Sequence, residues 1–153
     1  MKCFIFLAAL LLICVPFTYG QFVMTNLDKG SVSLLDSAYR NATATTADQS
    51  LPLHRGIRVS ATVIDTQNAG YVHNLGLIVT IQGKDPATIT YYTLLQSDTL
   101  FVEGTTTSFI VHPDITAVTN LMAKDLVPRS WRVQATLTDS GYINYKIGGE
   151  EVR

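Results

Sequence analysis

The chain has 153 residues, with 11 lysines and arginines against 12 aspartates and glutamates, and its formal net charge at pH 7 is −1. This balance, without any block of like charges, argues against electrostatic binding to nucleic acid or to an anionic membrane surface. The abundance of Thr, Ser, Val, Ile and Tyr favours strands over helices, and the length fits one folded domain.

The first twenty residues have the pattern of a secretory signal peptide. Lys2 is followed by an almost uninterrupted apolar run over residues 4–15, which ends at Pro16. A membrane-spanning helix needs about twenty apolar residues, so this run is too short to serve as an anchor. Small residues precede the expected cleavage point after Gly20, as in signal-peptidase sites. We therefore expect a secreted domain over residues 21–153; the alternative is a buried N-terminal helix.

Both cysteines, Cys3 and Cys14, lie in the segment that we expect to be removed. A mature chain without cysteine has no thiol nucleophile, no cysteine-ligated zinc and no disulfide framework. Small secreted domains often depend on disulfides, but a chain of this length buries roughly two-thirds of its unfolded surface. We expect a core that is stable without covalent cross-links.

The segment from Ala38 to Leu51 is rich in Ala, Thr, Asn and Asp and has little apolar periodicity, so it is predicted to be a long solvated loop. It contains Asn41-Ala42-Thr43, the one N-glycosylation sequon of the chain. On a secreted protein, Asn41 is therefore a candidate glycan acceptor. The alternative is a chance match to a short motif.

The middle of the chain shows alternating apolar and polar residues in several short stretches, a pattern typical of half-buried strands. Strands are predicted over residues 57–64, 75–81, 87–95, 100–103 and 108–112. Turns are predicted at residues 65–70, 83–86 and 104–107, where Gly, Pro, Asn and Asp are frequent. The last two strands, around Gly104, are predicted to form a hairpin.

The clearest alternation lies near the C-terminus, in residues 131–138 and 142–147. The three residues between them, Asp139-Ser140-Gly141, are typical of a tight turn, so a second hairpin is predicted here. A helix is predicted over residues 115–126 from apolar residues at helical spacing, although their β-branched neighbours keep a strand as the alternative. Together the elements predict an all-β or mainly β fold, an antiparallel sandwich or barrel with one short helix.

No pattern for catalysis or for metal binding stands out. His54, His73 and His112 lack the short paired spacing of zinc ligands, so no metal site and no cofactor are predicted. The chain has no strand–turn–helix nucleophile motif and no phosphate-binding loop. Of the three glutamates, Glu150 and Glu151 lie in a C-terminal segment that is expected to be frayed. A non-enzymatic role is therefore favoured, with a secreted hydrolase as a weaker alternative.

Aromatic residues on expected strands are the best candidates for a binding surface. Tyr91 and Tyr92 are adjacent, so their side chains should point to opposite faces of a strand, one of them outward. Trp131 begins the most regular strand of the chain. These three residues are a candidate ligand or partner surface, although core packing is the usual role of aromatic residues on strands and is the favoured interpretation.

The sequence therefore predicts a small extracellular binding protein that is monomeric and has no stable membrane anchor. Its ligand is expected to be an apolar small molecule or lipid held between the sheets. The alternative is a defence or host-interaction effector that meets an extracellular protein through one sheet face. No stretch carries a motif of a known family, so no functional residue is transferred from one.

Overall fold

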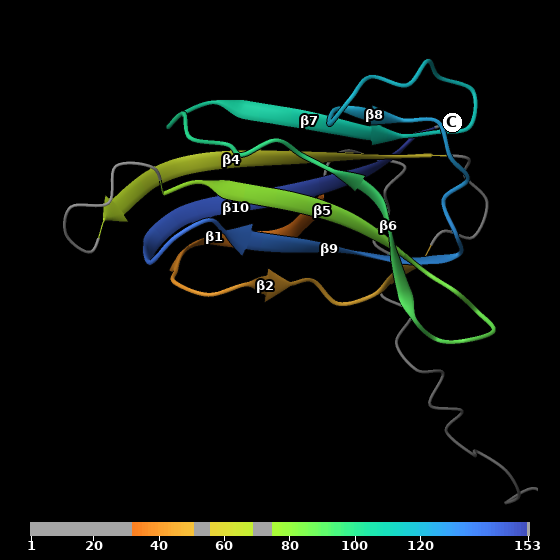
Figure 1. The fold of residues 1–153 in the computed structure, drawn as a ribbon, viewed down its shortest axis with the longest axis horizontal. Helices are drawn as coiled ribbons and strands as arrows, with labels where there is room; N and C mark the ends of the chain where they lie inside the picture. Colours follow the sequence, from red (N-terminus) through yellow and green to blue (C-terminus); the bar gives the residue numbers. More distant parts are fainter. Residues whose placement is uncertain (1–31, 51–55, 69–74, 153) are drawn as a thin grey trace, which may run out of the picture.

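The computed structural model describes residues 32–50, 56–68 and 75–152, and all regular structure within these ranges is β (Figure 1). The strands form two sheets that pack face to face, which confirms the predicted all-β sandwich. None of the described residues belongs to a helix of the length and hydrophobicity needed to span a membrane. The expected signal peptide over residues 1–20 lies outside the described residues and stays a prediction.

Sheet A contains five strands in the order β1-β10-β4-β7-β8. Their bounds are β1 Val32–Arg40, β4 Gly56–Asn68, β7 Thr106–Val111, β8 Met122–Ala123 and β10 Gly141–Val152. Neighbouring strands are antiparallel except β7 and β8, which run parallel. Figure 1 shows β4 and β10 as long, curved ribbons that extend along the molecule.

Sheet B has the order β2-β9-β5-β6, and β3 also pairs with β9. Its strands are β2 Ala44–Thr45, β3 Gln49–Ser50, β5 Leu77–Lys84, β6 Tyr91–Gln96 and β9 Ser130–Leu137. All pairs in this sheet are antiparallel. β2 and β3 follow one another along the same edge of β9, opposite Ala135 and Trp131.

The core lies between the sheets and is built by the inward-facing residues of the long strands. The predicted inner faces of four strands are confirmed, since alternate residues are buried as expected. The buried apolar residues are Ile57, Val59, Ala61, Val63, Leu75, Leu77, Val79, Ile81, Leu94, Leu95, Phe109, Val111, Trp131, Val133, Ala135, Ile143, Tyr145 and Ile147. A filled apolar layer of this extent supplies the main driving force for folding.

The predicted C-terminal hairpin is wrong, although both of its strands exist. β9 pairs with β2, β3 and β5 in sheet B, whereas β10 pairs with β1 and β4 in sheet A. The three residues after Leu137, Thr138 to Ser140, therefore carry the chain from one sheet to the other. A tight-turn sequence between two alternating segments is compatible with either connection, because alternation specifies which face is buried but not which strand is the partner.

The helix predicted over residues 115–126 is also absent. The amide groups of Leu121 and Met122 donate to the carbonyl oxygen of Val118 and close a turn in which Asn120 has a φ of 61°. Met122 then starts β8, which pairs with β7. The β-branched residues that open this segment disfavour a helix, and pairing with the edge of sheet A satisfies the backbone instead.

About half of the long loop predicted from Ala38 to Leu51 is strand. Ala38 belongs to β1, and β2 and β3 follow at Ala44–Thr45 and Gln49–Ser50. Thr46 is buried between them: its amide group donates to the Val133 carbonyl at 2.9 Å, and its hydroxyl accepts from the Val133 amide at 3.0 Å. Edge pairing of this kind needs no apolar periodicity, so the sequence carries no local sign of these strands.

Several predicted boundaries are also corrected. β4 continues to Asn68, through part of a predicted turn, because it pairs with the beginning of β10. Residues 87–90 form a turn and not a strand. The hairpin around Gly104 is wrong, because β7 pairs with β4 and β8 while Leu100 pairs with Leu77.

The C-terminal segment is not frayed as far as the structure describes it. β10 runs to Val152, and the Glu150 carboxylate lies 2.5 Å from the Arg58 guanidinium. This ion pair joins β10 to β4, where the two residues are directly opposite one another.

Candidate functional site

The three aromatic residues predicted to form one surface are separated by the structure. Trp131 is 1% exposed and belongs to the core, so its placement on a surface is wrong. Tyr92 is 44% exposed at the edge strand β6, next to Gly83 and Pro128. Tyr91 is half-buried and points to the outer face of sheet B, as its contacts with Lys84 and Arg132 indicate.

Tyr91 belongs to a polar cluster whose members satisfy one another. Its hydroxyl donates to the Asp48 carboxylate at 2.5 Å, and Lys84 donates to the same carboxylate at 2.8 Å. The Arg132 guanidinium carbon lies 3.4 Å from the centre of the Tyr91 ring. The cluster fastens the segment before β3 to the outer face of sheet B, a structural role.

The electrostatics of this cluster follow from its contacts. Partial burial favours the neutral form of Asp48, but hydrogen bonds from Lys84 and Tyr91 and the charge of Lys84 outweigh it, so the pKa of Asp48 is lowered. The hydrogen bond to Asp48 raises the pKa of Lys84 in turn. At neutral pH both groups are charged and form an ion pair with each other.

The remaining predicted site residues are dispersed. Asn41 is exposed in the bend after β1, which is compatible with glycosylation, and its modification stays a prediction. His112 is buried and its Nδ1 accepts from the Asp114 amide at 3.1 Å, while His54 and His73 lie outside the described residues. Among the described residues, no three His, Cys, Asp or Glu side chains gather where a metal ion could be held.

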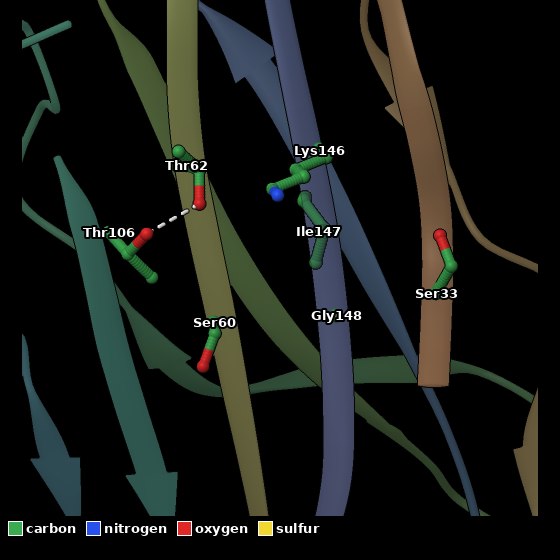
Figure 2. A pocket seen from close by; sticks show the side chains of 7 residues that line it. All are labelled: Ser33, Ser60, Thr62, Thr106, Lys146, Ile147 and Gly148. Carbon is green, nitrogen blue, oxygen red and sulfur yellow. Dashed lines mark hydrogen bonds between the residues drawn. The ribbon is translucent and has the colours of Figure 1, made fainter. Parts of the chain in front are cut away.

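A depression of about 310 Å³ lies on the outer face of sheet A and is a different kind of site (Figure 2). We call it the sheet A depression. Its lining residues are Ser33, Ser60, Thr62, Thr106, Lys146, Ile147 and Gly148, from strands β1, β4, β7 and β10. Five of these seven side chains end in a hydroxyl or ammonium group, so the site is built to form hydrogen bonds.

The register of sheet A explains why these groups meet. Ser60 is opposite Gly148 on β10 and Ser108 on β7, while Thr62 is opposite Lys146 and Thr106. Residues directly opposite one another point to the same face, so two rows of outward side chains run across the sheet. Gly148 has no side chain, which leaves open space within its row, between Ser33 and Ser60.

The hydroxyl groups within the rows are paired, but each pair keeps capacity for a ligand. The oxygens of Thr62 and Thr106 are 2.7 Å apart (Figure 2). Those of Ser60 and Ser108 are 3.1 Å apart. One hydroxyl of a pair donates and the other accepts, which leaves one proton and several lone pairs free in each pair.

Lys146 is the one charged residue that lines the depression. Figure 2 shows its ammonium group reaching from β10 toward β4, on the side of Thr62. No carboxylate of the described residues forms an ion pair with it. The depression therefore presents a positive charge among neutral hydroxyl groups.

Two exposed tyrosines lie on the same face, beyond the Lys146 end of the depression. Tyr142 lies on β10 four residues before Lys146, so the two side chains point to the same face of the sheet. The Tyr142 side chain is 45% exposed. Tyr39 on β1 is opposite Asn144, and its hydroxyl donates to the Asp65 carboxylate on β4. This contact holds the Tyr39 ring across the strands, and the face therefore combines aromatic surface with hydroxyls and a cation.

A second pocket of about 480 Å³ lies at the edge of sheet B, where Pro86, Ile89 and Pro128 contribute apolar surface. Ile89 is 68% exposed and has a φ of 61°, a conformation that is unfavourable for a β-branched residue. The pocket adjoins the Asp48–Lys84 ion pair, and both of these residues line it.

The sheet A depression has no local signal in the sequence. The alternation in residues 57–64 already indicated that Ser60 and Thr62 point outward. Nothing local indicated that Thr106 and Lys146 would lie beside them, because these contacts depend on the pairing of distant strands.

Comparison with known proteins adds little to this description. No family model matches the chain, and no curated protein matches it significantly. Among solved structures, the chain resembles one titled "Structure of infectious bursal disease virus Gt strain", at 14% identity and a TM-score of 0.40. The match covers 78% of this chain and 31% of that chain, so the chain spans less than a third of the neighbour's length.

Proposed function

We propose that this protein is a secreted, non-enzymatic binding protein that recognises its ligand or partner through the outer face of sheet A. The observation that carries the proposal is the depression of about 310 Å³, lined by hydroxyl groups and by a lysine that has no ion-pair partner among the described residues. Exposed polar groups that converge on a concave site, beside aromatic rings, are typical of recognition surfaces.

Because the core between the sheets is filled, we favour a binding site on the surface over a cavity that carries an apolar molecule. Apolar side chains from both sheets occupy the space between them, and most are less than 2% exposed. Both the sheet A depression and the pocket at the edge of sheet B open outward. An apolar ligand between the sheets would have to displace packed core residues, at a cost of several kcal/mol.

The chemistry of the depression also favours binding over catalysis. A serine or threonine nucleophile needs a neighbouring base, most often a histidine or a carboxylate. The residues that line the depression include neither. Lys146 supplies charge and hydrogen-bond donors, which suits the recognition of an anionic or polar group.

A pair of matched substitutions tests the proposal. Thr62→Arg places a bulky side chain in the depression, while Thr136→Arg places the same group on the outer face of sheet B. Residues 21–153 with each substitution are tested for binding to immobilised extracellular matrix proteins, mucin and glycosaminoglycans. We expect Thr62→Arg to lose binding that Thr136→Arg retains.

Native mass spectrometry before and after organic extraction tests the alternative. The proposal predicts the bare polypeptide mass, with or without a glycan. An extractable apolar adduct, or equal loss of binding in both arginine variants, would contradict it.

A further inference from the structure

We infer that the sheet A depression binds a sugar residue that carries one anionic group. The inference rests on the proposed function and names the ligand class of the same site. Three properties of the depression lead to it: one positive charge, two rows of neutral hydroxyl groups and a volume that suits one small ring.

The charge of the site matches a single anionic substituent. Lys146 has no ion-pair partner among the described residues, and no acidic residue lines the depression with it. The nearest ion pair on this face joins Arg58 to Glu150, and these two groups neutralise each other. A ligand with one carboxylate or sulfate group would therefore complete the charge balance at Lys146.

The hydroxyl rows match the polar rim of a sugar. Neighbouring strands are about 4.8 Å apart, and residues two apart on one strand are separated by about 6.7 Å. The pairs Thr62–Thr106 and Ser60–Ser108 are therefore placed at intervals comparable with those of the hydroxyl groups across a six-membered ring. Each pair can donate one proton and accept others, as a sugar hydroxyl also does.

The size of the depression fits one sugar unit. Pockets for drug-sized ligands have volumes of roughly 300–1,000 Å³, and this one is at the lower limit. The open space above Gly148 lies between the Ser33 and Ser60 side chains, where a ring could lie against the sheet.

Tyr142 extends the site in one direction. It lies four residues from Lys146 on β10, which is roughly 13 Å along a strand. A sugar seated above Gly148 lies on the other side of Lys146, roughly 20 Å from Tyr142 along the strand. Tyr142 would therefore contact only a longer saccharide that runs along β10 past Lys146, and not a single unit.

Isothermal titration of residues 21–153 with small sugars tests the inference. The probes are methyl β-glucuronide, glucose 6-sulfate and neutral methyl β-glucoside, with sodium acetate and sodium sulfate as anions without a sugar. We expect at least one anionic sugar to bind with a Kd on the order of 1 mM, as suits a small exposed site. The glucoside and both simple anions should bind at least tenfold more weakly.

Three variants locate the site. Lys146→Met removes the charge and Gly148→Val fills the space beside Ser60, and each should weaken binding of the anionic sugar at least tenfold. Lys124→Met removes an exposed lysine from the segment between β8 and β9 and should leave binding unchanged. Circular dichroism and Trp131 fluorescence confirm that each variant is folded.

The outcomes separate the inference from the proposed function. Absence of binding by both anionic sugars, equal binding of the glucoside, or equal binding of acetate or sulfate would overturn the inference. Equal losses in Lys146→Met and Lys124→Met would overturn it as well. The proposed function is tested separately: it fails if the Thr62→Arg and Thr136→Arg variants behave alike or if an apolar adduct can be extracted.

Discussion

Adjacent residues of β7 should differ sharply in their contribution to stability. Phe109 is 1% exposed and packs in the core, whereas Ser108 is exposed on the outer face and pairs with Ser60. A buried aromatic side chain removes about 150–250 Å² from water, which corresponds to about 4–6 kcal/mol at 25 cal/mol per Å². Since alanine keeps part of this burial, Phe109→Ala should lower the free energy of unfolding by about 3–5 kcal/mol.

Ser108→Ala is the matched control in the same strand. It removes one exposed hydrogen bond and should change the free energy of unfolding by no more than about 0.5 kcal/mol. Urea unfolding followed by the fluorescence of Trp131, the one tryptophan of the chain, measures both variants. Equal losses in the two variants, or a larger loss for Ser108→Ala, would refute the assignment of the two faces of sheet A.

Three further substitutions test other parts of the structure. Tyr145→Phe should raise the free energy of unfolding by about 1 kcal/mol at pH 7, because the buried Tyr145 hydroxyl has no hydrogen-bond partner among the described residues. Burial also raises the pKa of Tyr145, and Arg40 partly opposes this shift. The unfolded chain therefore loses the phenol proton more readily than the folded protein does. As the pH rises above 10.0, the stability of the wild type should fall more than that of the variant. Asp48→Asn should be less stable than wild type at pH 6. The difference in melting temperature should begin to shrink as the pH falls below 3.8 and disappear as it passes through the folded-state pKa of Asp48, which is lower. Ile89→Asn should raise the free energy of unfolding by up to about 1–2 kcal/mol in chemical denaturation, because asparagine tolerates the positive φ; a loss of stability would contradict the strain at this turn.

The faces of the long strands could be predicted from the sequence because burial in a sheet has a period of two residues. Val59 and Val133 lie on the apolar faces of the alternating segments 57–64 and 131–138, and both are buried. Strand partners carry no such local signal. The segments that became β9 and β10 are joined by a turn sequence that suits a hairpin, yet each strand pairs with distant strands in a different sheet.

The candidate site was hidden from the sequence for the same reason. Thr62 lies 44 residues from Thr106 and farther still from Lys146, so their proximity depends on the pairing of β4 with both β7 and β10. The burial of Trp131 likewise depends on the packing of one sheet on the other. An aromatic residue that alternates with polar neighbours can face either the core or solvent until the sheet is assembled.

Amide chemical-shift mapping of ¹⁵N-labelled residues 21–153 during titration with methyl β-glucuronide and glucose 6-sulfate tests the central claim most directly. We predict that the largest shifts occur at Ser60, Thr62, Thr106, Lys146 and Gly148, and that the amides of the outer face of sheet B stay unchanged. Shifts centred on inward-facing core residues, or on the cluster around Tyr91, would contradict a binding site on the outer face of sheet A.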